Sequence, residues 1–322
     1  MGKDQKITAS IGISIFPDHA DNVSSLITKA EIALIDARNN PRLFSIYSEQ
    51  IANADVYTLD MENELDKAIE NDELSLYFQP QTNLQTGEIY GAEALIRWRH
   101  PEKGFIRPDI FIPIAEQSGQ IHKITWWTLN TALRLIKEWP TDWPPLKLAL
   151  NISAKVLRDM TFVDSMKSAL KLWNISSSKL TLEITESAIM EDLTASFITL
   201  EELKALNFGI SIDDFGTGYS SMAYFKNIPA NELKIDQSFV FYMLDNNMDR
   251  HIVTTIIDLG KGFNMNVVAE GIENAATFEA LKELGCNIAQ GYHIARPMPQ
   301  DDFIKWVNKY QESQFRQSNT RN

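Results

Sequence analysis

The sequence predicts an α/β fold, a modified (β/α)8 barrel whose first strand runs antiparallel to the second, preceded by a small partial α/β segment. Eight strand-like segments follow one another from residue 74 onward, and helix-length segments separate most of them. The connection between the first two strands is too short for a helix and indicates a hairpin. The chain of 322 residues is 44% hydrophobic, which suffices for one large domain and a small extra piece.

The first 52 residues predict a separate β-α-β piece. Ile7–Phe16 alternates like a strand, Val23–Arg38 has helical spacing, and Leu43–Tyr47 is typical of a second short strand. About 45 residues cannot bury a stable core alone, so this piece is expected to be part of a larger domain. Asp55–Asp72 is amphipathic and acidic, and predicts a helix that connects this piece, through residues 53–72, to the main domain.

The main domain is predicted from alternating strand and helix patterns. Strands are expected at Leu74–Phe78, Ile89–Trp98, Leu146–Asn151, Leu180–Ile184, Gly209–Asp213, Glu232–Ile235, Asn266–Ala269 and Asn287–Gln290. Helices are expected at Ala154–Trp173, Asp192–Leu206, Asp249–Gly262, Ala275–Leu284 and Gln300–Tyr310. Only Gln79–Glu88, which contains Thr86-Gly87, joins the first two strands, hence the hairpin. Residues 313–322 are expected to form a polar, frayed tail.

Composition excludes several classes of protein. The net charge of −13 argues against binding to a nucleic-acid polymer, which needs a basic surface. The single cysteine, Cys286, allows no internal disulfide, predicts a packing role, and makes a zinc cluster improbable. No apolar run approaches the ~20 residues that span a bilayer, and the N-terminus lacks a signal-peptide core. We therefore expect a cytoplasmic protein without membrane contact in this segment.

Polar residues recur where the predicted strands end. They are Gln79, Glu93 and Arg97 on the first two strands, then Asn151, Glu183, Asp213, Asp214, Lys234, Asp236, Glu270 and Gln290 on the other six. A single acid at such a position is most often a helix N-cap or a surface charge. Polar residues at all eight ends are better explained by a site, because the strand ends of a barrel meet at one rim.

The residue types indicate metal-dependent hydrolysis of an anion. Crowded carboxylates repel one another and must be neutralised. Ligation by Glu, Asp and Asn oxygens suits two Mg²⁺ or Mn²⁺ ions, which are suited to in-line attack at phosphorus. Lys234 could orient the attacking water, and Arg97 could neutralise a phosphate oxygen. Asp213 is followed by a glycine-containing stretch, which predicts a mobile lid or switch over the metal site.

The motif Glu93-Ala94-Leu95 occurs together with seven others in order along the chain. The others are Phe78-Gln79-Pro80, Asn151-Ile152-Ser153, Glu183-Ile184-Thr185-Glu186-Ser187, Asp213 through Ser221, Leu233-Lys234-Ile235-Asp236, Ala269-Glu270-Gly271-Ile272-Glu273 and Gln290-Gly291-Tyr292. This set resembles the EAL domain, the family of cyclic di-GMP phosphodiesterases. The likeness covers roughly residues 60–310, and residues 60–312 are expected to be the catalytic domain. It implies a TIM-like barrel with an antiparallel first strand and hydrolysis of cyclic di-GMP to linear pGpG by a metal-activated water.

The resemblance also implies residue roles. Glu93, Asn151, Glu183 and Asp213 hold one metal ion, while Asp213, Asp214 and Asp236 are candidates for a second. Glu270 is the expected general base and Lys234 contacts the water. Gln79, Leu95 and Arg97 meet the phosphate and ribose side of the substrate, with Asp214, Glu273 and Gln290 as further pocket residues. Glu186 fixes the loop of Phe215, Gly216, Thr217, Gly218, Tyr219 and Ser220, which couples the substrate and metal to a homodimer contact.

The N-terminal piece has a resemblance of its own. Ile7 through Ser14 and Ala30-Glu31-Ile32-Ala33-Leu34 look like the C-terminal tail of a GGDEF domain, the diguanylate cyclase module. The cyclase loop is absent from this chain, so we expect no cyclase activity and a missing upstream GGDEF and sensor region. Two alternatives stay open for the main domain: a cyclic di-GMP receptor that does not hydrolyse it, and a scaffold that binds no nucleotide. His293, unusual for the family, is expected to be packed or exposed to solvent.

Overall fold

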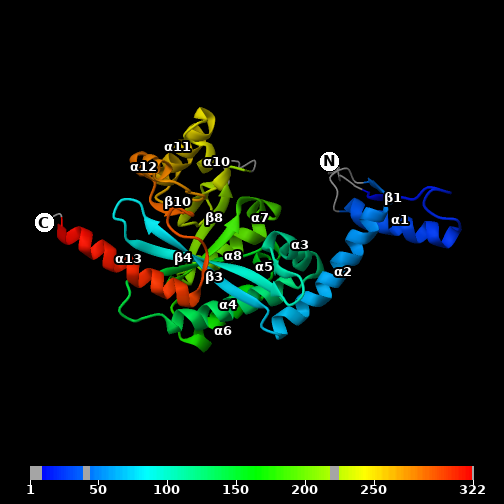
Figure 1. Ribbon diagram of the computed structural model, residues 1–322, viewed down its shortest axis with the longest axis horizontal. Helices are drawn as coiled ribbons and strands as arrows, with labels where there is room; N and C mark the ends of the chain where they lie inside the picture. The colour runs from blue at the N-terminus through cyan, green and yellow to red at the C-terminus, as the bar shows by residue number, and fades with distance from the viewer. Residues whose placement is uncertain (1–8, 39–43, 218–224, 321–322) are drawn as a thin grey trace, which may run out of the picture. The chain divides into compact units, whose positions relative to one another are not determined.

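The computed structural model describes residues 9–38, 44–217 and 225–320 and divides the chain into two compact units (Figure 1). These are Met1–Lys67 and Ala68–Asn322. The helix α2 (Glu49–Glu70) carries the chain from the first unit into the second, and begins six residues before the predicted start at Asp55. No helix in the described ranges combines the length and apolarity that crossing a bilayer requires.

The first unit contains the predicted β-α-β piece. Strands β1 (Ile11–Ile13) and β2 (Phe44–Ile46) pair in parallel, and α1 (Val23–Arg38) connects them. Gly12 allows the helix to pack closely, because a Cβ at this position would lie 2.1 Å from the carbonyl oxygen of Ala30. The strands are shorter than predicted, and the predicted ends Ile7 and Leu43 lie outside the described residues.

The second unit is a closed eight-stranded barrel. Its strands in order around the barrel are β3 (Leu74–Asn83), β4 (Ile89–His100), β6 (Lys147–Asn151), β7 (Leu180–Thr185), β8 (Gly209–Phe215), β9 (Glu232–Ile235), β10 (Asn266–Ala269) and β11 (Ile288–Gln290). β3 pairs antiparallel with both β4 and β11, and neighbouring strands from β4 to β11 pair in parallel. The predicted modified barrel is therefore confirmed.

The β3–β4 hairpin sets this orientation. Its register runs from Leu74 opposite Trp98 to Thr82 opposite Ile89, with an irregularity between Gln81 and Thr82. The side chain of Asn83 closes the turn by accepting hydrogen bonds from two backbone amides, at 2.9 Å each. The predicted strand end at Phe78 was wrong: β3 continues for five more residues, so Gln79 lies inside the strand.

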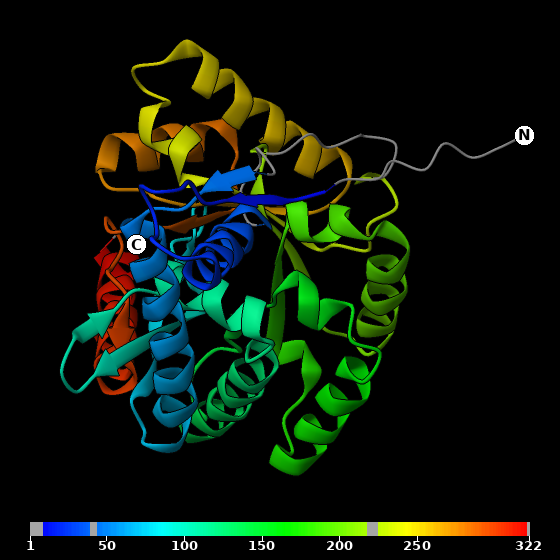
Figure 2. The same ribbon diagram turned by 90° about the vertical axis from the view of Figure 1, so that its right-hand side faces the viewer.

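Helices cover the outside of the barrel, and Figure 2 shows α11 and α12 (yellow and orange) on one side and the green helices on another. They are α3 (Pro108–Ser118), α4 (Ile121–Glu138), α5 (Ala154–Leu157), α6 (Phe162–Trp173), α7 (Glu186–Glu191), α8 (Leu193–Ala205), α10 (Gln237–Tyr242), α11 (Asn247–Gly262), α12 (Ala275–Leu284) and α13 (Gln300–Thr320). A 3-10 turn at Ser177–Lys179 and the short strands β5 (Gly104–Ile106) and β12 (Met298–Pro299) complete the unit.

Two helix predictions were wrong. Ala154–Trp173 is not one helix but α5 and α6, because the Asp159 carboxylate accepts hydrogen bonds from the backbone and hydroxyl of Thr161, both at 2.8 Å, and offers the backbone a turn instead of a helix. α13 continues through Thr320 rather than ending at Tyr310, so the polar tail is helical up to that residue. Tyr310 holds this helix to the hairpin by donating a hydrogen bond to the carbonyl oxygen of Gly87 at 2.9 Å.

The barrel strands are buried on both faces. In β9 and β10 the side chains of Leu233, Ile235, Val267 and Val268 are fully inaccessible, as expected for strands with side chains inside and helices outside. The bounds of both strands were predicted to the residue. Burial of a polar residue on these strands is therefore unfavourable in free energy unless hydrogen bonds or ion pairs compensate for the lost contacts with water.

Candidate active site

The strand register brings the predicted polar residues to one end of the barrel. Asn151 at the end of β6 lies opposite Glu183 on β7, and Thr185 on β7 lies opposite Asp213 on β8. β4 is the other neighbour of β6, and on it Glu93 lies opposite Gln79 of β3. The carboxyl ends of parallel strands form one rim, where active sites of barrel enzymes are found.

Lys234 is the centre of this cluster. Its side chain is 1% exposed, and its Nζ lies 2.8 Å from Glu270, 3.0 Å from Glu183, 3.2 Å from Asp213 and 3.6 Å from Glu93. A buried ammonium group is stable only when it is paired, and four carboxylates provide that pairing. The sequence predicted that these residues meet, and the distances show how tightly they do.

Burial and mutual repulsion shift the pKa values of the cluster. Burial raises the pKa of Glu270 to about 8 although Lys234 opposes the rise, and burial and repulsion from Glu93 raise the pKa of Glu183 well above its usual value. Burial, followed by repulsion from Asp213, raises the pKa of Asp214 to about 6. Burial also acts against the charged form of Lys234, but Glu183 and Glu270 outweigh it and raise its pKa well above the usual value.

Glu93 is a buried carboxylate that is held by two side-chain amides. Its Oε1 accepts a hydrogen bond from the Asn151 amide at 2.7 Å, and its Oε2 accepts one from the Gln290 amide at 2.6 Å. Burial favours the neutral acid, but Lys234 and these amides outweigh it and lower the pKa of Glu93. Glu93 is therefore held as an anion with both oxygens oriented.

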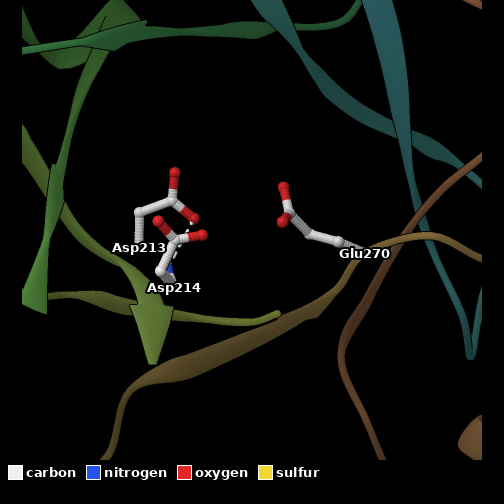
Figure 3. Close-up of side chains that lie close together, drawn as sticks. All are labelled: Asp213, Asp214 and Glu270. Carbon is white, nitrogen blue, oxygen red and sulfur yellow. Dashed lines mark hydrogen bonds between the residues drawn. The ribbon is translucent and has the colours of Figure 1, made fainter. Parts of the chain in front are cut away.

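The oxygen donors fit a divalent cation. Asp213, Asp214 and Glu270 each offer a carboxylate oxygen, and these oxygens lie within 4.8 Å of one another. Figure 3 shows the two aspartates on one side and Glu270 facing them. Glu183 Oε1 is buried without a hydrogen-bond partner in the described structure, which is costly unless another group binds it. Hard oxygen ligands of this kind suit Mg²⁺ or Mn²⁺.

A cavity of about 510 Å³ opens above the cluster. Its lining includes the predicted residues Gln79, Glu93, Leu95, Arg97, Asp213, Lys234, Glu270, Glu273 and Gln290. It also includes Gln237, Gly271, Gly291, Tyr292 and Pro297, to which the sequence analysis assigned no role. Gln237 and Gly271 directly follow the predicted strand-end residues Asp236 and Glu270, so extending each strand end by one residue would have found them.

Other predicted residues lie outside the cavity lining. Asp236 caps α10 by accepting a hydrogen bond from the Ser238 backbone at 3.0 Å, and its charge contributes to the raised pKa of Asp214. His293 is exposed and its ring packs 5.6 Å from that of Phe278, in agreement with the predicted packing or solvent-facing role.

The predicted loop after β8 is described only in part. Buried Glu186 accepts a hydrogen bond from the Gly216 backbone at 3.1 Å, so the first turn of the loop is fixed. Gly216 has φ +98°, a conformation that favours glycine. Thr217 follows it and is exposed, whereas Phe215 is buried at the end of β8. Gly218, Tyr219 and Ser220 lie outside the described residues.

The sequence is similar to those of two curated proteins of Pseudomonas aeruginosa. MucR of Pseudomonas aeruginosa, a bifunctional diguanylate cyclase/cyclic di-GMP phosphodiesterase, is 40% identical over 307 residues, which cover 94% of this chain and 44% of MucR. The cyclic di-GMP phosphodiesterase NbdA of the same species is 35% identical over 314 residues, covering 96% of this chain and 40% of NbdA. The chain thus spans less than half the length of these curated relatives.

A solved structure and a family model match the barrel. The PaMucR phosphodiesterase in complex with c-di-GMP aligns with a TM-score of 0.72 and 42% identity, covering 76% of this chain and 99% of that chain. The EAL domain model matches residues 62–297, which contain the whole cluster around Lys234. The chain therefore belongs to the EAL-domain family.

Proposed function

We propose that this protein is a metal-dependent phosphodiesterase that hydrolyses cyclic di-GMP to linear pGpG. The cluster of four carboxylates around Lys234, at the floor of a polar cavity, is the observation that carries the proposal. MucR and NbdA, which carry cyclic di-GMP phosphodiesterase in their names, support the choice of substrate. In the reaction water adds to phosphorus, the bond from phosphorus to the 3′ oxygen breaks, and that oxygen takes up a proton.

The metal ligands in this proposal are the acidic residues of the rim. Glu93, Asn151, Glu183 and Asp213 would hold one Mg²⁺ or Mn²⁺ ion, with Asp213, Asp214 and Asp236 as ligands of a second. When bound, the ions would neutralise the phosphate and lower the pKa of the attacking water. The unpartnered Glu183 Oε1 and the close carboxylates of Asp213 and Asp214 support this assignment.

The chain's own side chains would move the proton and hold the substrate. Glu270, with a pKa of about 8, accepts the proton of the attacking water, because a base works best with a pKa near the operating pH. Lys234, at 2.8 Å from Glu270, keeps that carboxylate oriented and contacts the water. Half-buried Arg97, at the cavity wall, binds a phosphate oxygen. Gln79, Leu95, Glu273 and Gln290 would contact the rest of the nucleotide.

Three further features belong to the same proposal. Residues 1–52 would be the C-terminal fragment of a GGDEF-like domain, consistent with exposed apolar residues such as Ile11 and Phe44 on its two-stranded sheet. The barrel would form a homodimer coupled to the site through Glu186 and the loop that it holds; exposed Phe241 and Met248 on α10 and α11 support such a contact. The lone buried Cys286 is consistent with a cytoplasmic location.

Product analysis tests this function. The full chain is incubated with cyclic di-GMP and Mg²⁺ or Mn²⁺, with and without a chelator, and the nucleotides are separated by chromatography. We expect metal-dependent pGpG from the wild type and from Glu88→Gln, an exposed carboxylate near the start of β4, and none from Glu93→Gln. Binding of cyclic di-GMP without pGpG would establish the receptor alternative instead, and no binding in calorimetry would leave the scaffold alternative.

A further inference from the structure

Gln81 is a buried amide whose position next to the site follows from the antiparallel first strand. It is 2% exposed and lies two residues after Gln79 on β3, so both side chains point to the same face. β3 lies between β11 and β4, and its register places Gln81 opposite Gln290 on one neighbour and Gln79 opposite Glu93 on the other. Gln81 is not part of the cavity lining and lies behind Gln290.

These side chains form a directed chain of hydrogen bonds. Gln81 Nε2 donates to Gln290 Oε1 at 2.8 Å, and Gln290 Nε2 donates to Glu93 Oε2 at 2.6 Å and to Gln79 Oε1 at 3.2 Å. An ionised carboxylate only accepts hydrogen bonds, so Glu93 requires the NH₂ group of Gln290 to face it. The Gln290 oxygen must then point away from Glu93, into a buried region where Gln81 supplies a donor.

We propose that Gln81 is a positioning residue that acts through Gln290 on Glu93. Without its donor, Gln290 Oε1 would be buried and unsatisfied, and the amide would rotate or withdraw to find another partner. Glu93 would then lose the hydrogen bond that orients Oε2 and keep only the one from Asn151 to Oε1. The inference rests on the proposed function in one respect: Glu93 is taken as a metal ligand, and groups that orient a ligand tune the affinity for the metal.

The test compares Gln81→Leu with Thr82→Val in the full chain. Leu removes the amide at similar size, and Thr82 is a matched control because it is 1% exposed and adjacent on β3, with its side chain on the opposite face. We expect Gln81→Leu to weaken Mn²⁺ binding in calorimetry by roughly 10- to 100-fold, and Thr82→Val to leave it unchanged. Gln81→Met replaces Gln81→Leu if the latter does not fold.

A second readout needs no metal. The Gln290 side-chain NH₂ signals, identified by their loss in Gln290→Leu, should exchange with water faster in Gln81→Leu than in the wild type, because the amide is no longer fixed at both ends. Coupling is checked in the double variant: if Gln81 acts through Gln290, Gln81→Leu should have no further effect on Mn²⁺ affinity in the Gln290→Leu background.

The outcomes separate the two proposals. If the wild-type protein binds no Mn²⁺, the proposed function is contradicted. The exchange of the Gln290 side-chain NH₂ group then still tests the hydrogen-bond chain, because that measurement needs no metal. Wild-type Mn²⁺ affinity together with unchanged Gln290 exchange in both Gln81→Leu and Gln81→Met would overturn the positioning role. Equal losses in Gln81→Leu and Thr82→Val would overturn it as well, because they would show a general effect of disturbing β3.

Discussion

Replacing Lys234 by methionine tests whether one buried ammonium group holds the barrel's acidic rim together. Methionine keeps most of the length of the side chain but removes its charge. Lys234 is 1% exposed, and Glu93, Glu183, Asp213 and Glu270 surround it at 2.8–3.6 Å. The variant therefore leaves four carboxylates close together without their central cation, and each must take up a proton or repel its neighbours.

The expected loss of stability follows from these distances. One pair of unit charges at about 3 Å contributes about 5 kcal/mol at an effective dielectric constant of about 20. Two such pairs already exceed the desolvation cost of the ammonium group, which is several kcal/mol. Removing one partner of a buried pair typically costs about 3–5 kcal/mol after the remaining groups adjust, and we expect at least this loss in the free energy of unfolding.

The loss should also depend on pH. Burial already raises the folded-state pKa values of Glu183 and Glu270 above the unfolded value of about 4.3. Without Lys234 these pKa values rise further, so the folded state binds more protons than the unfolded state. Stability must then fall as pH rises above the unfolded pKa. We expect the difference between wild type and Lys234→Met to be larger at about pH 8 than at about pH 5.5.

Urea unfolding with a chelator present measures this difference. Lys305→Met is the control, because Lys305 is exposed and forms a surface ion pair with Asp302 at 3.1 Å, and its loss should cost less than about 1 kcal/mol. In a separate measurement on the wild type without the chelator, Mn²⁺ at about 100 times its dissociation constant should stabilise the folded protein by about 2.7 kcal/mol. A loss below about 1 kcal/mol in Lys234→Met, or one that shrinks as pH rises, would refute the reasoning.

Three further predictions concern the site and the core. Mn²⁺ affinity should rise as pH rises through about 6, because Asp214, a proposed ligand with a pKa of about 6, must lose its proton to bind the ion. Calorimetry in buffers of different ionisation enthalpy should detect the proton release, and pH-independent binding would contradict this. Glu186→Gln should weaken the hydrogen bond to Gly216 by about 1.5 kcal/mol and speed its amide exchange; unchanged exchange would remove the anchoring role. Cys286 is buried, and burial raises the pKa of its thiol to about 12. It should not react with a colorimetric thiol reagent in the folded protein at about pH 8, and should react only after unfolding. Reaction in the native state would show that the thiol is accessible.

The sequence predicted the elements that have one dominant local signal. Leu233 and Ile235 alternate with charged residues in β9, Val267–Ala269 is an apolar run in β10, and α12 begins after the N-cap Asn274 and ends before Gly285, so the bounds of all three were predicted correctly. β3 was predicted too short because Pro80 normally marks the end of a strand. Here Pro80 lies within the hairpin, opposite Ala92, a position that depends on tertiary pairing.

For the candidate site, too, local sequence signals predicted one part, and the part that depends on tertiary structure was missed. Strand ends identified which polar residues meet at the rim, because parallel strands align their carboxyl ends. They did not predict that Lys234 contacts four carboxylates, since side-chain reach and rotamer depend on the closed barrel. Gln81 was missed although its two-residue spacing from Gln79 was visible, because only the pairing with β11 gives it a partner.

The reversed first strand also decides where the chain enters the barrel. Leu74, the first residue of β3, lies opposite Trp98 beyond the level of Glu93, whereas a parallel first strand would begin at the far end. Glu73, directly before it, accepts a hydrogen bond from the Trp98 indole at 3.0 Å and one from the Arg99 backbone at 2.9 Å. A mechanical pull on α2 would therefore act first on the rim of the barrel that carries the acidic cluster, and only then on the opposite rim.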